Sequence, residues 1–304
     1  MNSKPISYIA LCFAALLGLA AGNMPAQASG PAAVSWRQLV FQAVHPAGQV
    51  RVVIDLEPSE ASDLRDLTGT QGTLLMPGNA GLQRLTGDIN ASAMFIDKQW
   101  RGQAWFLEDG TALQRSRFKP GEKGDYRLYR YTSEGVARKR FRPEGDQQAA
   151  LPPEQWGKVK EKFFSFGSSS RGCDKIFDAF ALLYPLSAHG LGADPGQGVC
   201  VFNKKGLYLV HLEAADSAPI SLSLNQGPDN LIRRLANGVE SQGIALRPQP
   251  LGALQQEREP FEFMGLEGDI RVYLDPVTGL PLRLSGDLGG LGRVELDLTG
   301  VDLR

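Results

Sequence analysis

A regular alternation of apolar and polar side chains in residues 269–304 most strongly constrains the fold. Apolar residues take every second position in three short runs, a period typical of strands with one buried face. The runs are 270–274, 280–284 and 294–298. Asp275-Pro276 and a glycine-rich link separate them and favour turns. We therefore expect a three-stranded antiparallel meander that forms a sheet edge at the end of the chain.

Alternating segments also fill most of the upstream sequence. Five of them follow one another with glycine in each separator, a pattern that predicts successive hairpins. These segments are 94–96, 103–107, 113–118, 126–131 and 136–141, and residues 97–102 are expected to be a turn. Similar runs lie at 36–45, 50–56, 199–202, 207–212 and 220–224. The sequence predicts a mainly β protein.

Residues 152–186 interrupt the strand pattern and predict a helical insertion. Two prolines open a first helix that we expect to run to Lys162, with Trp156, Val159 and Phe163 spaced for one face. Asp174 is positioned to cap a second helix over 175–186. A further segment, 229–236, is compatible with either a helical turn or a strand.

The N-terminus carries the features of an export signal. Lys4 precedes an apolar stretch over 6–21, and Ala26-Gln27-Ala28 supplies a small-x-small cleavage site. The apolar stretch is short for a membrane span. We expect a signal peptide over residues 1–28 and a mature domain over 29–304, in the periplasm of a Gram-negative cell. No transmembrane anchor is expected after cleavage.

The balance of charge narrows the range of partners. Lys and Arg number 32 and Asp and Glu 33. A chain this close to neutral lacks the general positive field on which non-specific nucleic-acid binding depends. Nucleic acid is therefore not an expected partner.

Two cysteines, Cys173 and Cys200, remain after the signal. In an oxidising compartment such a pair favours a disulfide that closes a loop of 27 residues. The alternative is a redox or metal site, which the absence of a C-x-x-C motif and of a nearby histidine pair disfavours.

Catalytic motifs are not evident in the sequence. The three histidines are far apart, and no metal-ligand spacing connects them. The serine-rich loop at 167–172 does not fit G-x-S-x-G, and no apolar strand leads into it. We therefore expect no enzyme activity, metal or cofactor, although a hydrolase with a dispersed site stays a minor alternative.

Basic residues recur on three of the predicted strands. They are Arg115, Arg117, Arg127, Arg130, Arg138, Lys139, Arg140 and Arg142. One interpretation is a positive face for an acidic lipid headgroup or a protein partner. The other is the solvated face of a one-sided sheet, whose arginine stems cover the backbone.

The terminal segment resembles an exported bacterial family, domain of unknown function 3108. The resemblance rests on Tyr273-Leu-Asp-Pro, on Leu280-Pro-Leu-Arg-Leu-Ser-Gly and on Gly292-Arg-Val-Glu-Leu-Asp-Leu-Thr. It implies a fold similar to that of the lipoprotein-localisation factors, a strongly curved antiparallel half-barrel with two or three covering helices. It implies an envelope protein and supplies no catalytic residues.

Two hypotheses for function follow. In the first, the half-barrel encloses an apolar cavity for a lipid, an acyl chain or a lipidated partner, and the covering helices gate it. The candidate lining residues are Phe95, Trp105, Leu128, Phe177 and Phe180. These same residues would equally form an ordinary packed core. In the second hypothesis, an envelope scaffold or assembly factor binds another protein through a sheet edge or the arginine-rich face.

Overall fold

One fifteen-stranded sheet dominates the computed structural model, which describes residues 34–45, 48–67, 71–93, 96–167, 172–190, 198–252, 259–289 and 291–304. The strands are β1 (Trp36–His45), β2 (Gly48–Ser59), β3 (Leu82–Ala93), β4 (Ile96–Leu107), β5 (Ala112–Lys119), β6 (Asp125–Tyr131), β7 (Gly135–Arg142), β8 (Lys158–Ser165), β9 (Phe177–Asp178), β10 (Val199–Asn203), β11 (Gly206–Ile220), β12 (Val239–Pro250), β13 (Leu266–Leu274), β14 (Pro281–Leu288) and β15 (Gly292–Leu303). The described α-helices are α1 (Asp146–Ala149), α2 (Leu183–His189) and α3 (Asp229–Ala236), and short 3-10 helices span Ala61–Asp63 and Pro153–Gln155.

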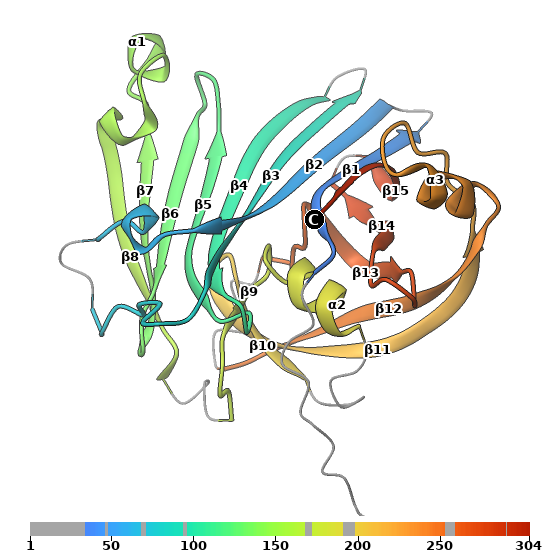
Figure 1. Cartoon of the computed structure of the whole chain (residues 1–304). Coiled ribbons are helices and arrows are strands. Elements are labelled where there is room, and N and C mark those ends of the chain that lie inside the picture. Colours follow the sequence, from blue (N-terminus) through green and yellow to red (C-terminus); the bar gives the residue numbers. More distant parts are fainter. Residues whose placement is uncertain are drawn as a thin grey trace, which may run out of the picture. The chain divides into compact units, whose positions relative to one another are not determined.

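The strand order combines two meanders. Strands β1 to β8 neighbour one another in sequence order, as do β9 to β15, and β1 pairs with β15 to join the two halves (Figure 1). Every pairing is antiparallel except that of β9 with β10. The predicted terminal meander is present as β13 to β15, but the expectation that it forms an edge is wrong. Strand β15 lies between β1 and β14, and the edges are β8 and β9.

The sheet curves strongly without closing. Its β9 edge returns toward β5, where the Ala112 amide donates to the Ile176 carbonyl at 2.9 Å. Strands β6 to β8 continue beyond this meeting point as a separate wall (Figure 1). This confirms the predicted mainly β fold with a strongly curved antiparallel sheet. The approach of β9 to β5 places that wall opposite the β10–β11 hairpin.

Apolar side chains fill the concave side of the sheet. Residues Ala179 to Leu186, which lead into and form much of α2, are buried there among the inward-facing residues of β1 to β4 and β10 to β15. Phe180 lies over a pair of glycines, Gly87 and Gly102, which are register partners on β3 and β4. Because neither glycine has a side chain, the Phe180 ring packs directly against the strand backbone.

The structure corrects the first predicted helix. Apart from the 3-10 turn Pro153–Gln155, the segment forms strand β8, whose eight residues pair with β7 from Arg142↔Lys158 to Gly135↔Ser165. The prediction failed because Val159 and Phe163 are four residues apart, a spacing that also fits one face of a strand. Trp156 is buried in a small aromatic cluster beside β6 and β7.

The second predicted helix is present only in part. Residues 177–178 form β9, and the helix α2 begins at Leu183. The expected cap, Asp174, lies outside it. The undecided segment 229–236 is helix α3, with Leu231 and Leu235 buried. The predicted turn over 97–102 is also wrong, since β4 runs without a break from Ile96 to Leu107.

A disulfide joins Cys173 to Cys200, with the two Cα atoms 5.8 Å apart, as predicted. It connects the segment before β9 to β10. The bridge lies beside the Phe202 aromatic cluster, where Tyr129, Tyr131, Phe164 and Phe166 surround the Phe202 ring. The crosslink therefore fixes β9 against β10 next to the wall formed by β6 to β8.

Candidate functional site

Two cavities adjoin each other between strands β5 to β8, here called the β5–β8 wall, and the β10–β11 hairpin. The basic cavity, of about 490 Å³, is lined by β5, β6, β7 and the segment 259–267. The apolar cleft, of about 330 Å³, lies between β8 and the hairpin. Lys204 and Glu259 line both. Each volume falls within the range of about 300–1,000 Å³ usual for small-molecule sites.

Strand register places a row of cations on the wall of the basic cavity. Arg117 on β5 pairs with Arg127 on β6, Arg127 with Arg140 on β7, and Arg140 with Lys160 on β8. Arg117 is also the partner of Gly102, over which Phe180 lies, so the row is on the same face of the sheet as the core. Like charges in directly opposed positions repel one another, and such a row needs compensating anions.

Asp125 supplies one of these anions from the start of β6. Its carboxylate accepts hydrogen bonds from the Nε atoms of Arg127 at 2.6 Å, Arg142 at 3.4 Å and Arg140. Burial alone would raise the pKa of Asp125, but the hydrogen bond from Arg140 and the charge of Arg127 outweigh it and lower the pKa. Asp125 therefore stays ionised and holds three arginine side chains together.

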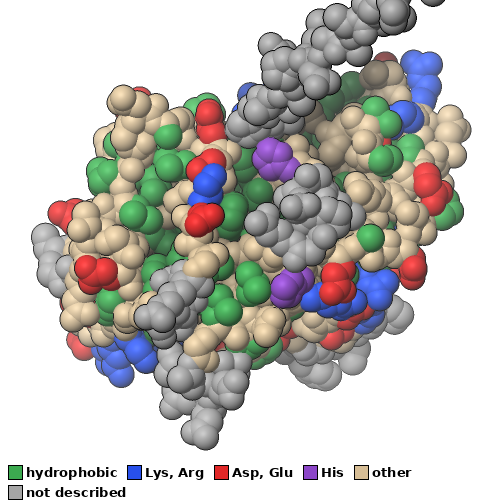
Figure 2. Space-filling model, turned by 90° about the horizontal axis from the view of Figure 1, so that it is seen from below, with side chains coloured by type: hydrophobic (Ala, Val, Ile, Leu, Met, Phe, Trp, Pro, Cys, Tyr) green, Lys and Arg blue, Asp and Glu red, His purple; other side chains and the backbone are tan. Residues whose placement is uncertain are grey.

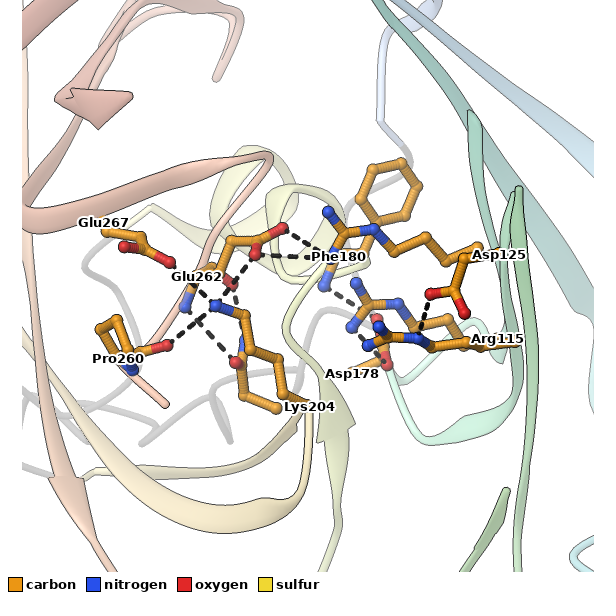
Figure 3. Close-up of polar contacts among 11 residues, drawn as sticks. Arg115, Asp125, Asp178, Phe180, Lys204, Pro260, Glu262 and Glu267 are labelled. Atoms are coloured by element: carbon orange, nitrogen blue, oxygen red, sulfur yellow. Dashed lines mark hydrogen bonds and ion pairs between the residues drawn. The ribbon is translucent and has the colours of Figure 1, made fainter. Parts of the chain in front are cut away.

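Glu262 supplies the second anion from the opposite side of the cavity. Its carboxylate lies 3.4 Å from Arg117 Nη1 and 3.0 Å from Lys204 Nζ, and only 9% of the residue is exposed. Burial opposes ionisation, but the charges of Arg117 and Lys204 lower the pKa of Glu262. Figure 3 shows Glu262 between Lys204 and the arginines of the wall. This ion pair links the β5–β8 wall to the rest of the fold.

Two tight turns position Glu262 and Lys204. Lys204 has a left-handed backbone conformation, φ +51°, in the turn between β10 and β11. Met264 and Gly265 also have positive φ, and Phe263 and Leu266 exchange backbone hydrogen bonds around them, as in a type I′ turn. Asn203 connects the turns, because its buried amide donates to the Glu262 carbonyl at 2.6 Å.

A second buried ion pair lies on the same face of the sheet, beside the core residue Phe180. The Arg115 guanidinium lies 3.6 Å from the Asp178 carboxylate and 6.0 Å from the centres of the Tyr129 and Phe180 rings. The Tyr131 hydroxyl donates to Asp178 at 2.6 Å. Burial, together with the neighbouring Asp178 charge, raises the pKa of Tyr131 well above its ordinary value. This group anchors β9 to β5 and β6 and lines neither of the two cavities.

The apolar cleft has aromatic walls, and its lining also includes three lysines and one carboxylate, Glu259. Its apolar lining comes from β8, from the hairpin and from the segment after β12, with the three lysines Lys162, Lys204 and Lys205 around it. The apolar members are Phe163, Phe164, Phe166, Phe202, Leu207, Tyr208, Pro250 and Leu251. Hydrophobic side chains gather on the side of the molecule where β6 to β8 lie, as the view from below shows (Figure 2).

The structure does not bring the five candidate lining residues together in one cavity. Phe95 lies outside the described residues. Trp105 and Leu128 are buried on the face of the sheet opposite to the arginine row. Phe180 belongs to the packed core and Phe177 packs against it. The cavities described here are lined by other residues.

The arginine-rich strands divide into different environments, which the sequence alone does not distinguish. Arg115 and Arg130 are buried, and Arg130 lies on the outer face, where it donates to the Leu113 carbonyl at 2.6 Å. Arg117, Arg127 and Arg140 line the basic cavity. The sequence analysis missed Asp125, Lys204 and Glu262. In the sequence, Asp125 is only a charged residue at the start of a strand, Lys204 is one in a turn that ends in glycine, and Glu262 is one between two phenylalanines.

Within the described ranges, no group of three or more His, Cys, Asp or Glu side chains is arranged to hold a metal ion. None of the helices in those ranges combines the length and the apolar character needed to cross a bilayer. The linings of the two cavities offer cationic N–H donors beside an apolar surface.

Comparison with known proteins adds little to this description. No model of a known protein family matches the chain, and no curated protein matches its sequence. A crystal structure of a β-barrel-like protein of domain of unknown function 1849 from Brucella abortus is similar, with a TM-score of 0.43 and 8% identity over 89% of this chain and 98% of that chain. That domain differs from the one the terminal motif resembles. The fold is therefore defined by the chain's own structure, as one curved, open sheet of fifteen strands among the described residues.

Proposed function

We propose that the protein is a non-enzymatic periplasmic binding protein that holds the acyl chain of a lipid or of a lipidated partner in the apolar cleft. The observation that carries the proposal is the cleft itself, an aromatic and aliphatic depression of about 330 Å³ with lysines in its lining. Burying acyl methylenes there would contribute about 0.8 kcal/mol for each CH₂ group. Lys204 and Lys205 already pair with glutamates, whereas Lys162 lies over the Phe164 ring and suits an acyl compound whose polar end is anionic.

The cleft differs in place from the cavity expected from the sequence. The concave side of the sheet is packed with the side chains around Phe180. The proposed acyl site lies where β8 and the β10–β11 hairpin face each other. A ligand would enter beside the strand edge and would not have to displace α2.

The proposed compartment rests on two further features. The predicted signal peptide implies export, and the Cys173–Cys200 disulfide is of a kind that persists in oxidising compartments. The alternative of a scaffold that binds a partner strand at β8 has less support. Lys158, Lys160 and Lys162 are exposed on that edge strand, and lysines on an edge oppose further strand pairing.

Native mass spectrometry of detergent-free protein, followed by titration with a fluorescent fatty acid, tests the proposal. We expect co-purified lipid, and probe binding that weakens about tenfold in Leu251→Asp, because the variant places a negative charge in the cleft that opposes both the acyl chain and the carboxylate of the probe. Val277→Asp is the control, since Val277 is 81% exposed on the β13–β14 turn. Wild-type protein with neither lipid nor probe binding would refute the proposal.

A further inference from the structure

The basic cavity contains more positive than negative charge. Its described lining includes seven lysine and arginine side chains and four carboxylates. The carboxylates are already engaged: Asp125 by three arginines, Glu262 by Arg117 and Lys204, Glu267 by Lys204, and Glu259 by Lys205. The surplus of cations is therefore available to a ligand and is not neutralised within the site.

The arginines also keep free hydrogen-bond donors. Arg140 and Arg142 contact Asp125 through their Nε atoms. Their Nη groups donate to no acceptor among the described residues. A guanidinium held in this way presents a planar pair of N–H donors, the geometry that binds phosphate oxygens in a bidentate manner. Asp125 is thus a positioning residue: by accepting hydrogen bonds from three arginines that would otherwise repel one another, it holds their N–H donors together on one side of the cavity.

Two lysines extend the array at the β5–β6 turn. Lys119 and Lys123 line the cavity, and no salt bridge joins either of them to a carboxylate in the described part of the chain. Lys119 is the register partner of Asp125, so it lies next to the three arginines. Isolated cations that line one concave site repel one another unless an anion occupies it.

We propose that the basic cavity binds a phosphate monoester, the headgroup of the same ligand whose acyl chain lies in the apolar cleft. A phosphate monoester carries a charge of about −1.5 to −2 and three terminal oxygens at neutral pH. It therefore matches several surplus cations, whereas a fatty-acid carboxylate offers one charge and two oxygens. Because Lys204 borders both cavities, one molecule can contact both. The statement that this phosphate belongs to a lipid rests on the proposed function, whereas phosphate binding in the basic cavity does not.

Isothermal titration calorimetry with three probes tests the inference. The probes are a short-chain phosphatidic acid, the diacylglycerol with the same chains, and inorganic phosphate. We expect wild-type protein to bind phosphatidic acid at least tenfold more tightly than diacylglycerol, since hydrogen bonds to charged groups contribute strongly. The preference should disappear in Lys123→Gln combined with Arg140→Gln. Arg51→Gln, an exposed arginine on β2 outside both cavities, is the matched control.

The outcomes separate this inference from the proposed function. Equal affinity for the two lipids, or a preference that survives in the double variant, overturns the phosphate site and leaves the acyl cleft standing. If neither lipid binds, the acyl cleft is refuted, and the titration with inorganic phosphate decides whether the basic cavity is a phosphate site. Phosphate binding that is lost in the double variant supports a site for free phosphate. No phosphate binding to the wild-type protein overturns the inference. Should Arg140→Gln fail to fold, Arg142→Gln replaces it, because the Arg142 side chain is 53% exposed.

Discussion

Replacing Gly87 with alanine tests whether Phe180 is a fixed part of the core. A Cβ atom at Gly87 would lie 2.5 Å from Cζ of Phe180, and one at Gly102 would lie 3.1 Å from it. The Phe180 residue is 1% exposed, and its ring centre lies 6.1 Å from that of Trp100. The ring therefore has little space into which it can move.

Two effects of opposite sign decide the magnitude. Alanine in place of glycine restricts the unfolded chain and stabilises the fold by about 0.4–1 kcal/mol where the native backbone accepts it. Extra atoms in a packed core cost about 1–3 kcal/mol. Since the contact of 2.5 Å is shorter than real Cβ contacts allow, overpacking prevails. We expect Gly87→Ala to lower the free energy of unfolding by about 0.5–2 kcal/mol.

A double-mutant cycle with Phe180→Leu isolates the contact. The smaller side chain makes room for the new methyl group, so Gly87→Ala should be neutral or stabilising in that background, with a coupling of about 1–3 kcal/mol. Urea unfolding of the four proteins measures it. Gly206→Ala serves as the control, because its nearest contact would be an ordinary 3.7 Å to Tyr208. Additive effects, or a stabilising Gly87→Ala in the wild type, would show that the Phe180 ring moves freely and that the packing argument is wrong.

Three further predictions concern the crosslink, the terminal turn and the basic cavity. Replacing Cys173 and Cys200 with serine should lower the free energy of unfolding by about 3.5 kcal/mol, the chain-entropy value for a 27-residue loop; a loss below about 1 kcal/mol in urea unfolding would contradict it. Asp275→Ala should cost about 1–3 kcal/mol in the same assay, since this buried carboxylate accepts hydrogen bonds from Arg234 and from the turn; an unchanged midpoint would count against that role. Burial raises the pKa of Asp125, but the hydrogen bond from Arg140 outweighs burial and lowers this pKa below its ordinary 3.8. Ionised Asp125 therefore stabilises the fold above about pH 4, and this contribution disappears as the pH falls through the folded-state pKa. Wild-type stability should therefore fall more steeply below pH 4 than that of Asp125→Asn, and parallel curves would refute the assignment.

Local patterning predicted most of the strands because their period of two reflects burial on one face. The hairpin between β1 and β2 and the meander from β13 to β15 follow this rule. The rule failed at β8, where an edge strand with exposed lysines buries little and so carries no clear period. It also failed at residues 97–102, where polar side chains in the middle of β4 were mistaken for a turn.

The candidate site depends on contacts that local patterning does not contain. Arg117 and Glu262 are 145 residues apart, and their ion pair exists only because the sheet curves until β9 reaches β5. The sequence showed that basic residues recur on the strands that become β5, β6 and β7. It did not show which arginines face inward, because register between neighbouring strands decides this. Phe180 was predicted to line a cavity because an apolar residue looks the same in a sequence whether it contacts a ligand or packs against a glycine backbone.

The pairing of β1 with β15 has a consequence for biogenesis. Trp36 lies opposite Leu303, so the first and last described strands meet in the middle of the sheet. Contacts of such sequence separation form late, because nearly the whole chain must be present before the two halves can join. In a chain that crosses a membrane from its N-terminus, β1 would emerge first and would stay unpaired on one side until β15 has also crossed. If the chain is exported as proposed, the sheet would be completed only after β15 has crossed, and until then the free edges of β1 and β14 would require protection from neighbouring chains.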